Sequence, residues 1–201
     1  MSALPELEAP RNNNGTFMPN TLAHEVIEQA QAGDQEAMTI LYETFQPQIF
    51  RYLYYRTSDY HLAQDLTAEV FVRLLRHLPT YQHRHGLFRA WLFEIARNLV
   101  IDHYRRMHRH SYTDLSDDMV DQRPTPEHTT ERRLNHEVLR QALRRLTQDQ
   151  CDVIALRFLA DMPIAEVAQV LNKSESAIKN LQLRGLAALQ QILSTRKISY
   201  D

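Results

Sequence analysis

Two histidine pairs are the residues of this sequence whose types and spacing come nearest to a metal site. His83 and His85 form one pair, and His108 and His110 form the other. Zinc needs a third and usually a fourth rigidly held ligand, and both pairs fall in an expected loop or helix end. Cys151 is the only cysteine, which excludes a cysteine-based zinc site and an intrachain disulfide. We therefore predict no metal and no cofactor, and a solvated or phosphate-contacting role for the histidines.

No arrangement of nucleophile, acid and base stands out in the chain. The sequence has no Gly-rich phosphate loop and no His-Glu-x-x-His metalloprotease pattern. The carboxylates from Asp114 to Asp121 precede a segment with prolines, where nothing would hold them against a reacting group. We therefore predict no catalytic residue, no enzymatic activity and no small-molecule substrate.

Arginines near the middle of the chain have the charge that contact with nucleic-acid phosphates would require. Arg97, Arg105, Arg106 and Arg109 place four positive charges in a short stretch with one acid, Asp102. Guanidinium groups neutralise phosphates, and single-stranded DNA also needs surfaces on which bases stack. The whole chain has 23 Lys and Arg against 25 Asp and Glu, a net charge of -2. That balance is weak evidence against a DNA binder that acts without a larger partner.

A helix-turn-helix pattern between Ile164 and Leu183 is the strongest local motif. Asn172 stands at the turn, which needs a left-handed backbone, and Ser174 is a good N-cap for the second helix. Lys173 departs from the pattern, because its position is usually apolar. Apolar residues would join the two helices, with a small residue at their crossing: Val167, Leu171, Ile178, Leu181 and Ala168.

The outward face of the second helix predicts DNA binding in the major groove. The residues expected on that face are Ser174, Glu175, Ser176, Lys179, Asn180 and Arg184. On this motif alone, an ordinary helical hairpin with a solvated face stays open as the alternative interpretation.

Helical periodicity organises the rest of the chain and predicts an all-α fold of two helical domains joined by a flexible acidic linker. We expect a disordered tail over residues 1–20, a first domain over 21–110, a linker over 111–130 and a second domain over 131–197. Pro47 predicts a kink or break in the helix that Asp34 would cap. Thr147–Gln150 has the sequence of a capping box, and Cys151 after it is interpreted as a small core residue.

Two blocks of the sequence resemble the sigma-70 family of transcription initiation factors, in its small extracytoplasmic-function branch. Leu41–Arg106 is similar to region 2 of the family in three successive segments, Leu41–Thr57, Asp65–Leu78 and Phe88–Arg106. Leu146–Leu193 is similar to region 4. The resemblance implies a region 2 helical bundle, a region 4 helix-turn-helix, and a function in directing RNA polymerase core to specific promoters.

The resemblance also implies binding sites. Region 2 would bind the polymerase through Asp65, Glu69, Val70, Phe71 and Arg73, although Val70 and Phe71 fit an internal core position equally well. Region 4 would read the -35 element through the outward residues of the helix-turn-helix. Trp91 is able to stack on a base, but its apolar neighbours favour a core position. The residues expected at the -10 element are His83, Arg84, Arg89, Arg97, Asn98, Arg105 and Arg106.

Two stretches depart from the family pattern and leave the promoter sequence open. Gln82–His85 lacks the acidic or small residues common in the -10 loop, and Asn180-Leu181 stands where the family often has Ser-Arg.

The partners that the resemblance implies are RNA polymerase core, through its large-subunit clamp and its flap, promoter DNA, and an anti-sigma factor. The acidic linker would either lie in a basic channel of the polymerase or act only as a soluble tether. The start of the chain has no signal-peptide pattern, and no apolar run approaches the roughly 20 residues that span a membrane. We therefore expect a cytoplasmic protein without direct membrane insertion. Two other functions stay open: a conventional helix-turn-helix regulator that acts without polymerase core, and a decoy that binds polymerase but no promoter.

Overall fold

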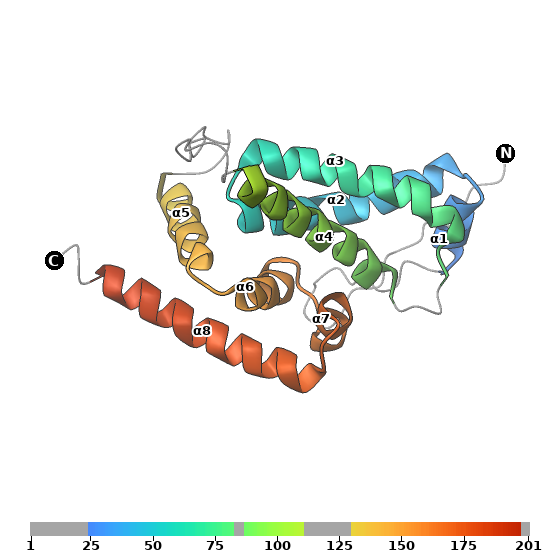
Figure 1. The fold of residues 1–201 in the computed structure, drawn as a ribbon. Helices are drawn as coiled ribbons and strands as arrows, with labels where there is room; N and C mark the ends of the chain where they lie inside the picture. Colours follow the sequence, from blue (N-terminus) through green and yellow to red (C-terminus); the bar gives the residue numbers. More distant parts are fainter. Residues whose placement is uncertain (1–23, 83–86, 111–129, 198–201) are drawn as a thin grey trace.

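The computed structural model describes residues 24–82, 87–110 and 130–197, and every regular element in these ranges is a helix (Figure 1). The all-α expectation is therefore confirmed for the described residues. The predicted tail over 1–20, nearly all of the predicted linker, and the loop residues His83 and Arg84 lie outside them.

Four α-helices and one short 3-10 turn form the N-terminal helical domain. They are α1 (His24–Gln31), α2 (Gln35–Thr57), α3 (Tyr60–His77), η2 (Leu78–Thr80) and α4 (Phe88–His110). Gly33, with a φ of 90°, lets the chain turn between α1 and α2. The Asp34 side chain then caps α2 by accepting from the Ala37 N–H at 2.8 Å. Asp59 caps α3 in the same way, accepting from the Leu62 N–H at 2.9 Å.

The break expected at Pro47 is absent, because α2 runs without interruption from Gln35 to Thr57. Proline removes one N–H from the helical ladder. Beside the proline, the Gln48 Nε2 donates to the Thr44 carbonyl at 3.0 Å. Burial of Phe45 and Ile49 on either side of the proline holds both halves of the helix against the same core.

The C-terminal helical domain consists of α5 (Thr130–Arg144), α6 (Gln148–Ile154), the π-helical turn η4 (Ala155–Leu159), α7 (Ile164–Leu171) and α8 (Glu175–Lys197). The capping box at the start of α6 is confirmed. The Thr147 hydroxyl accepts from the Gln150 N–H, and the Gln150 side chain accepts from the Thr147 N–H at 3.1 Å.

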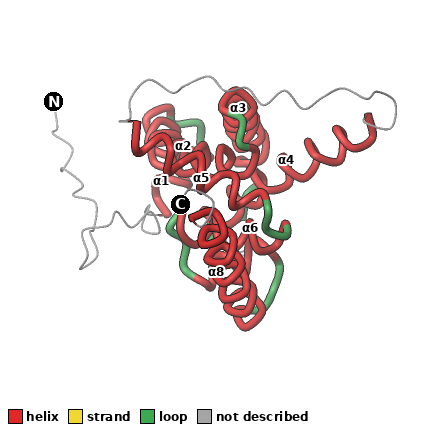
Figure 2. Tube along the Cα trace, turned by 90° about the vertical axis from the view of Figure 1, so that its left-hand side faces the viewer, coloured by secondary structure: helices red, strands yellow, loops and turns green. Residues whose placement is uncertain are grey.

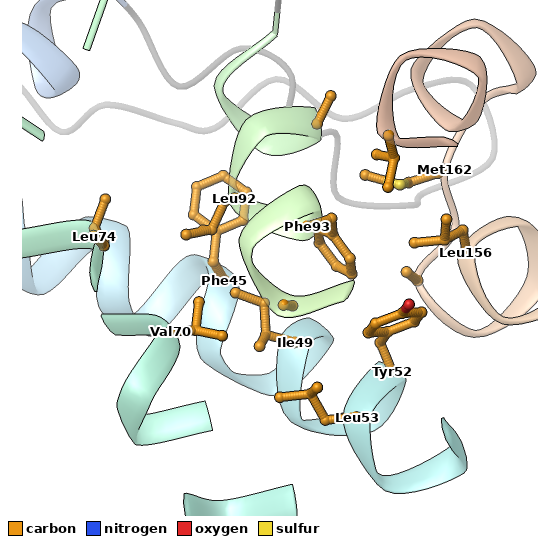
Figure 3. Packing of buried hydrophobic residues seen from close by; sticks show 14 of the residues in the cluster. Phe45, Ile49, Tyr52, Leu53, Val70, Leu74, Leu92, Phe93, Leu156 and Met162 are labelled. Atoms are coloured by element: carbon orange, nitrogen blue, oxygen red, sulfur yellow. The ribbon is translucent and has the colours of Figure 1, made fainter. Parts of the chain in front are cut away.

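The two domains pack against each other rather than standing apart. In Figures 1 and 2, α1–α4 form one body, and α5–α8 lie along one side of it. Two apolar clusters cross the boundary. In the larger one, Tyr52 and Phe93 from the first domain face Leu156 and Met162 from the second (Figure 3). All four of these side chains are fully buried, so removal of their surface from water stabilises the contact between the domains.

Candidate nucleic-acid interface

The turn before α8 has the geometry that the helix-turn-helix pattern predicts. Asn172 adopts the left-handed conformation, with φ 50° and ψ 49°. The Ala177 N–H donates to the Ser174 hydroxyl oxygen at 3.2 Å, which confirms Ser174 as the capping residue of α8. The expected departure at Lys173 also has an explanation, because its ammonium group pairs with the Asp149 carboxylate of α6 at 3.0 Å. An ion pair therefore takes the place of the usual apolar contact.

Packing on its inner side fixes which face of α8 points outward. Ile178 is fully buried, and Leu189, three turns further along, is 7% exposed. Gly185 lies between them, where an added Cβ would come within 3.1 Å of Ile154 on α6. This close approach holds α8 in one rotation about its axis. The residues predicted to contact DNA are all exposed on the other side of the helix: Ser174, Glu175, Ser176, Lys179, Asn180 and Arg184.

The predicted -10 residue Arg97 is held inside the contact between the domains by a buried carboxylate. Asp152 of α6 is fully buried. It accepts from the Arg97 Nε at 3.0 Å and from the Tyr52 hydroxyl at 3.0 Å, and it lies 2.7 Å from the Arg56 Nε. We call these four residues the Asp152 cluster. It joins α2, α4 and α6, and it satisfies a carboxylate whose burial would otherwise carry a large free-energy cost.

The pKa values within the Asp152 cluster follow from burial and from the shared carboxylate. Burial raises the pKa of the Tyr52 phenol well above its usual value, and the nearby negative charge of Asp152 raises it further. Burial by itself would lower the pKa of the Arg56 guanidinium, but Asp152 outweighs it, and the pKa is raised. The tyrosine is therefore neutral and the arginine charged in this cluster.

Arg89, another predicted -10 residue, is also enclosed between the domains. Its guanidinium, 4% exposed, lies 3.6 Å from the Glu166 carboxylate of α7. It donates to the Gln48 side chain at 2.9 Å and to the backbone carbonyl of Ala160. Burial lowers the pKa of Arg89, while Glu166 acts in the opposite direction. The second domain covers Arg89 in this arrangement, and its contact with DNA stays a prediction.

The other described -10 residues lie at the surface. Asn98, Arg105 and Arg106 are exposed along α4. Asn98 and Arg105 line an open cleft that α4 shares with the ends of α2, α5 and α6. Trp91 is half-buried and lies against the ring of Tyr81, with centroids 4.7 Å apart. It packs against the core as the sequence favoured, with part of its surface still exposed.

The residues of α3 that were predicted to bind polymerase fall into two groups, one on the helix surface and one in the core. Asp65 is exposed, and Glu69 pairs with Arg73 at 2.9 Å on the helix surface. Val70 is fully buried and Phe71 is 8% exposed, because both point into the core of the first domain. The expectation that they form apolar contacts with a partner is therefore contradicted in favour of the core alternative. The exposed large apolar residues of α3 are Val72 and Leu75.

Sequence reasoning missed Asp152 and Glu166, the two carboxylates that hold the domains together. A signal was present: Asp152 stands inside the run Cys151–Leu156, which is otherwise apolar. An acidic residue in such a run either interrupts the buried face of the helix or pairs with a buried basic side chain. Cys151 beside it is 4% exposed, as the core interpretation requires.

Other site types find little support among the described residues. No group of three or more His, Cys, Asp or Glu side chains there could hold a metal ion, and the side chains of His83, His85, His108 and His110 fall outside the description. Across the helices in these ranges, none combines the length and the apolar character required to cross a bilayer.

Comparison with known families identifies the two domains. Sigma-70 region 2 matches residues 41–110, and sigma-70 region 4 matches residues 142–191. The chain is also 32% identical over 163 residues to the ECF RNA polymerase sigma factor SigX of Bacillus subtilis, covering 78% of this chain and 84% of SigX. This protein belongs to the sigma-70 family. It falls among the extracytoplasmic-function (ECF) RNA polymerase sigma factors, which direct polymerase to promoters, and we refer to its two domains as region 2 and region 4.

Further relatives agree with this assignment. The ECF sigma factor BldN of Streptomyces coelicolor is 39% identical over 172 residues, which cover 84% of this chain and 65% of BldN. Among solved structures, CnrH in complex with the cytosolic domain of CnrY matches with a TM-score of 0.68 and 23% identity, covering 85% of this chain and 96% of that one. The sigma factor RpoE of Bartonella quintana, solved with the anti-sigma factor NepR, matches with a TM-score of 0.66 and 19% identity, covering 78% of this chain and 96% of that one. These structures support the fold.

Proposed function

We propose that region 4 of this sigma factor reads the -35 element through the outward face of α8. The observation that carries the proposal is the fixed rotation of α8, which turns Ser176, Lys179 and Asn180 away from the domain. An α-helix fits the major groove of B-DNA, and its first turns meet the base edges. Arg184, one turn further on, is placed to contact a phosphate. Ser174 and Glu175 belong to the same proposed surface.

Region 2, which we propose spans residues 21–110, binds the -10 element through the basic end of α4. Asn98, Arg105 and Arg106 are exposed there and form the accessible part of the surface. We propose that region 4 spans residues 131–197. Arg97 and Arg89 become part of the -10 surface only after the contact between region 2 and region 4 has opened. The packed arrangement is therefore the state of the free chain, and binding to polymerase separates the two regions.

The proposed polymerase-binding surface lies on the outer side of α3. Asp65, Glu69 and Arg73 supply its charges, as the family resemblance implies. Val72, 39% exposed, and Leu75, 57% exposed, supply its apolar area in place of Val70 and Phe71. Exposed apolar side chains flanked by charges are typical of protein–protein contact surfaces.

The proposal also covers the location of the protein, its lack of catalysis and its regulation. The chain acts in the cytoplasm, where polymerase and promoter DNA are found. It catalyses no reaction itself, because the polymerase supplies the chemistry of transcription. An anti-sigma factor holds it inactive, as a partner of this class is bound to the RpoE of Bartonella quintana.

Run-off transcription with purified core polymerase tests the proposal. We expect promoter-specific transcripts only when both core and this chain are present, and loss of promoter selection in Lys179→Ala. Gel shifts of the chain on duplex promoter DNA without core should give little specific binding, as its net charge of -2 indicates. Tight, specific binding by the chain alone would favour the conventional regulator instead. Binding to core without any transcript would favour the decoy.

A further inference from the structure

The most exposed large apolar side chain among the described residues lies on the proposed DNA-reading face. Leu183 of α8 is 69% exposed, compared with 57% for Leu75 and 52% for Phe158. Leaving a leucine in water forgoes the free energy that its burial would supply. A residue of this kind on a binding face is a candidate contact.

The position of Leu183 on α8 follows from helical periodicity and from the fixed inner face. It comes seven residues after Ser176, four after Lys179 and three after Asn180, which are the spacings of neighbours on one helix face. All three neighbours are exposed. Because Gly185 and Ile178 hold the opposite side of α8 against α6 and α7, the helix has no freedom to turn Leu183 inward.

The depth of Leu183 along the helix matches the reach of a reading helix. With a rise of 1.5 Å per residue, Leu183 lies about 12 Å from Glu175, the first residue of α8. A recognition helix lies along the major groove, which is about 12 Å wide and about 8.5 Å deep, and meets the bases with its N-terminal end, so Leu183 lies near the outer edge of the stretch that reaches the bases. Leu186, also exposed, lies about 16 Å from the helix start and falls beyond the groove.

The chemistry of an apolar side chain in the major groove selects one base. The 5-methyl group of thymine is the apolar group that a base pair presents there, and cytosine lacks it. We propose that Leu183 packs against the 5-methyl group of a thymine at the edge of the -35 element and contributes sequence specificity at that position. Arg184, the next residue along α8, binds a backbone phosphate and so helps to hold the leucine at this depth. The inference rests on the proposed function of region 4.

Replacement of thymine by deoxyuridine tests the contact, because it removes the methyl group and nothing else. The -35 element is first selected from a random duplex library with holoenzyme assembled from core and the full chain. Each thymine of the selected duplex is then replaced in turn, and binding of the wild-type and Leu183→Ala holoenzymes is measured. At one position we expect deoxyuridine to weaken wild-type binding about threefold to fivefold, the effect of one buried methyl-sized group. Leu183→Ala should be weaker on the thymine duplex and indifferent to deoxyuridine at that position.

Leu186→Ala is the matched control, since it removes the same side chain from the same helix outside the groove. It should keep the wild-type response to deoxyuridine at every position. Circular dichroism of both variants checks that α8 remains folded. Equal responses of wild type and Leu183→Ala at every thymine, or a selected element without thymine, would overturn the inference. So would a loss of core binding by Leu183→Ala in the absence of DNA, which would place Leu183 on a polymerase contact.

Failure of the inference is distinguishable from failure of the proposed function. If holoenzyme selects a -35 element and Lys179→Ala abolishes the selection, region 4 reads DNA whatever Leu183 does. If holoenzyme shows no preference at all in this part of the promoter, the proposed function of α8 is wrong and the test of Leu183 has already given a negative result.

Discussion

The two proposed DNA-binding faces of this sigma factor are in opposite states in the same structure. The α8 face of region 4 is open, with Lys179, Asn180 and Arg184 exposed. The α4 face of region 2 is partly closed, because Arg89 and Arg97 are bound to carboxylates of region 4. The difference shows that an arginine predicted to bind phosphate can instead form an ion pair with a carboxylate of a neighbouring domain. In our proposal, the -35 surface is accessible in the free chain, whereas the -10 surface requires the two regions to separate.

The largest expected effect is the loss of the charge at the centre of the contact between the regions. Asp152→Asn keeps the shape of the side chain and leaves Arg56 and Arg97 without their shared carboxylate. Breaking a buried ion pair by removing one partner costs about 3–5 kcal/mol. We expect the free energy of unfolding to fall by that amount in urea denaturation. Asp149→Asn is the control, because its pair with Lys173 is partly exposed and should change stability by less than about 1 kcal/mol. Equal effects of the two variants would show that the Asp152 cluster does not hold the regions together.

The reactivity of Cys151 reports directly on the closed state. The thiol is 4% exposed and packs in a cluster with Tyr55 of region 2 and Leu143 of region 4. Burial raises its pKa, against the opposing effect of Arg56, so little thiolate forms near pH 8. We expect alkylation by iodoacetamide to be at least about tenfold slower than for a cysteine in an unfolded peptide.

Alkylation of Cys151 also tests whether the two regions separate on the polymerase. Since Cys151 is the only cysteine, mass spectrometry of the labelled protein reads a single site. The rate should rise when the chain is bound to core polymerase and the regions separate. A rate in the holoenzyme as slow as in the free chain would argue that the closed arrangement persists on the polymerase.

A smaller effect is expected from the tyrosine of the Asp152 cluster. Tyr52→Phe removes one buried hydrogen bond and should lower the free energy of unfolding by about 0.5–1.5 kcal/mol. The pKa of Tyr52 is raised by burial, so the neutral phenol stabilises the folded state fully below the ordinary pKa of about 10. That stability should be lost as pH rises through the higher pKa of the folded state. Urea titrations from pH 8 to pH 11 should show this decline in wild type and a weaker one in Tyr52→Phe.

The smallest effect concerns the open face. Lys173→Met breaks the ion pair with Asp149 and places an apolar residue where helix-turn-helix proteins usually have one. Because the pair is partly exposed, we expect a change within about 1 kcal/mol, read as a small shift in thermal midpoint. A loss as large as that of Asp152→Asn would mean that the α8 face depends on buried charge as the α4 face does.

Local features of the sequence determined the secondary structure of this protein. Each cap needs only a side chain and a backbone N–H three residues away, so Asp34, Thr147 and Ser174 were recognisable from short stretches. The left-handed turn at Asn172 is equally local. The outward face of α8 followed from the 3.6-residue period once Ile178 was assigned inward. The helical fold and the -35 candidates therefore could be predicted from the sequence.

Contacts between distant parts of the chain, which sequence patterns do not reveal, control which arginines are buried. Arg89 and Arg97 have the same sequence signature as Arg105 and Arg106, but the first two meet Glu166 and Asp152, which lie 77 and 55 positions further along the chain. Val70 and Val72 are two residues apart on α3, and the packing of the first domain buries one and exposes the other. A buried charge needs a partner, and that partner is brought close by the fold rather than by sequence spacing. For that reason composition and periodicity located the basic helix, while the contact between the two regions determined which of its arginines are buried and which stay exposed.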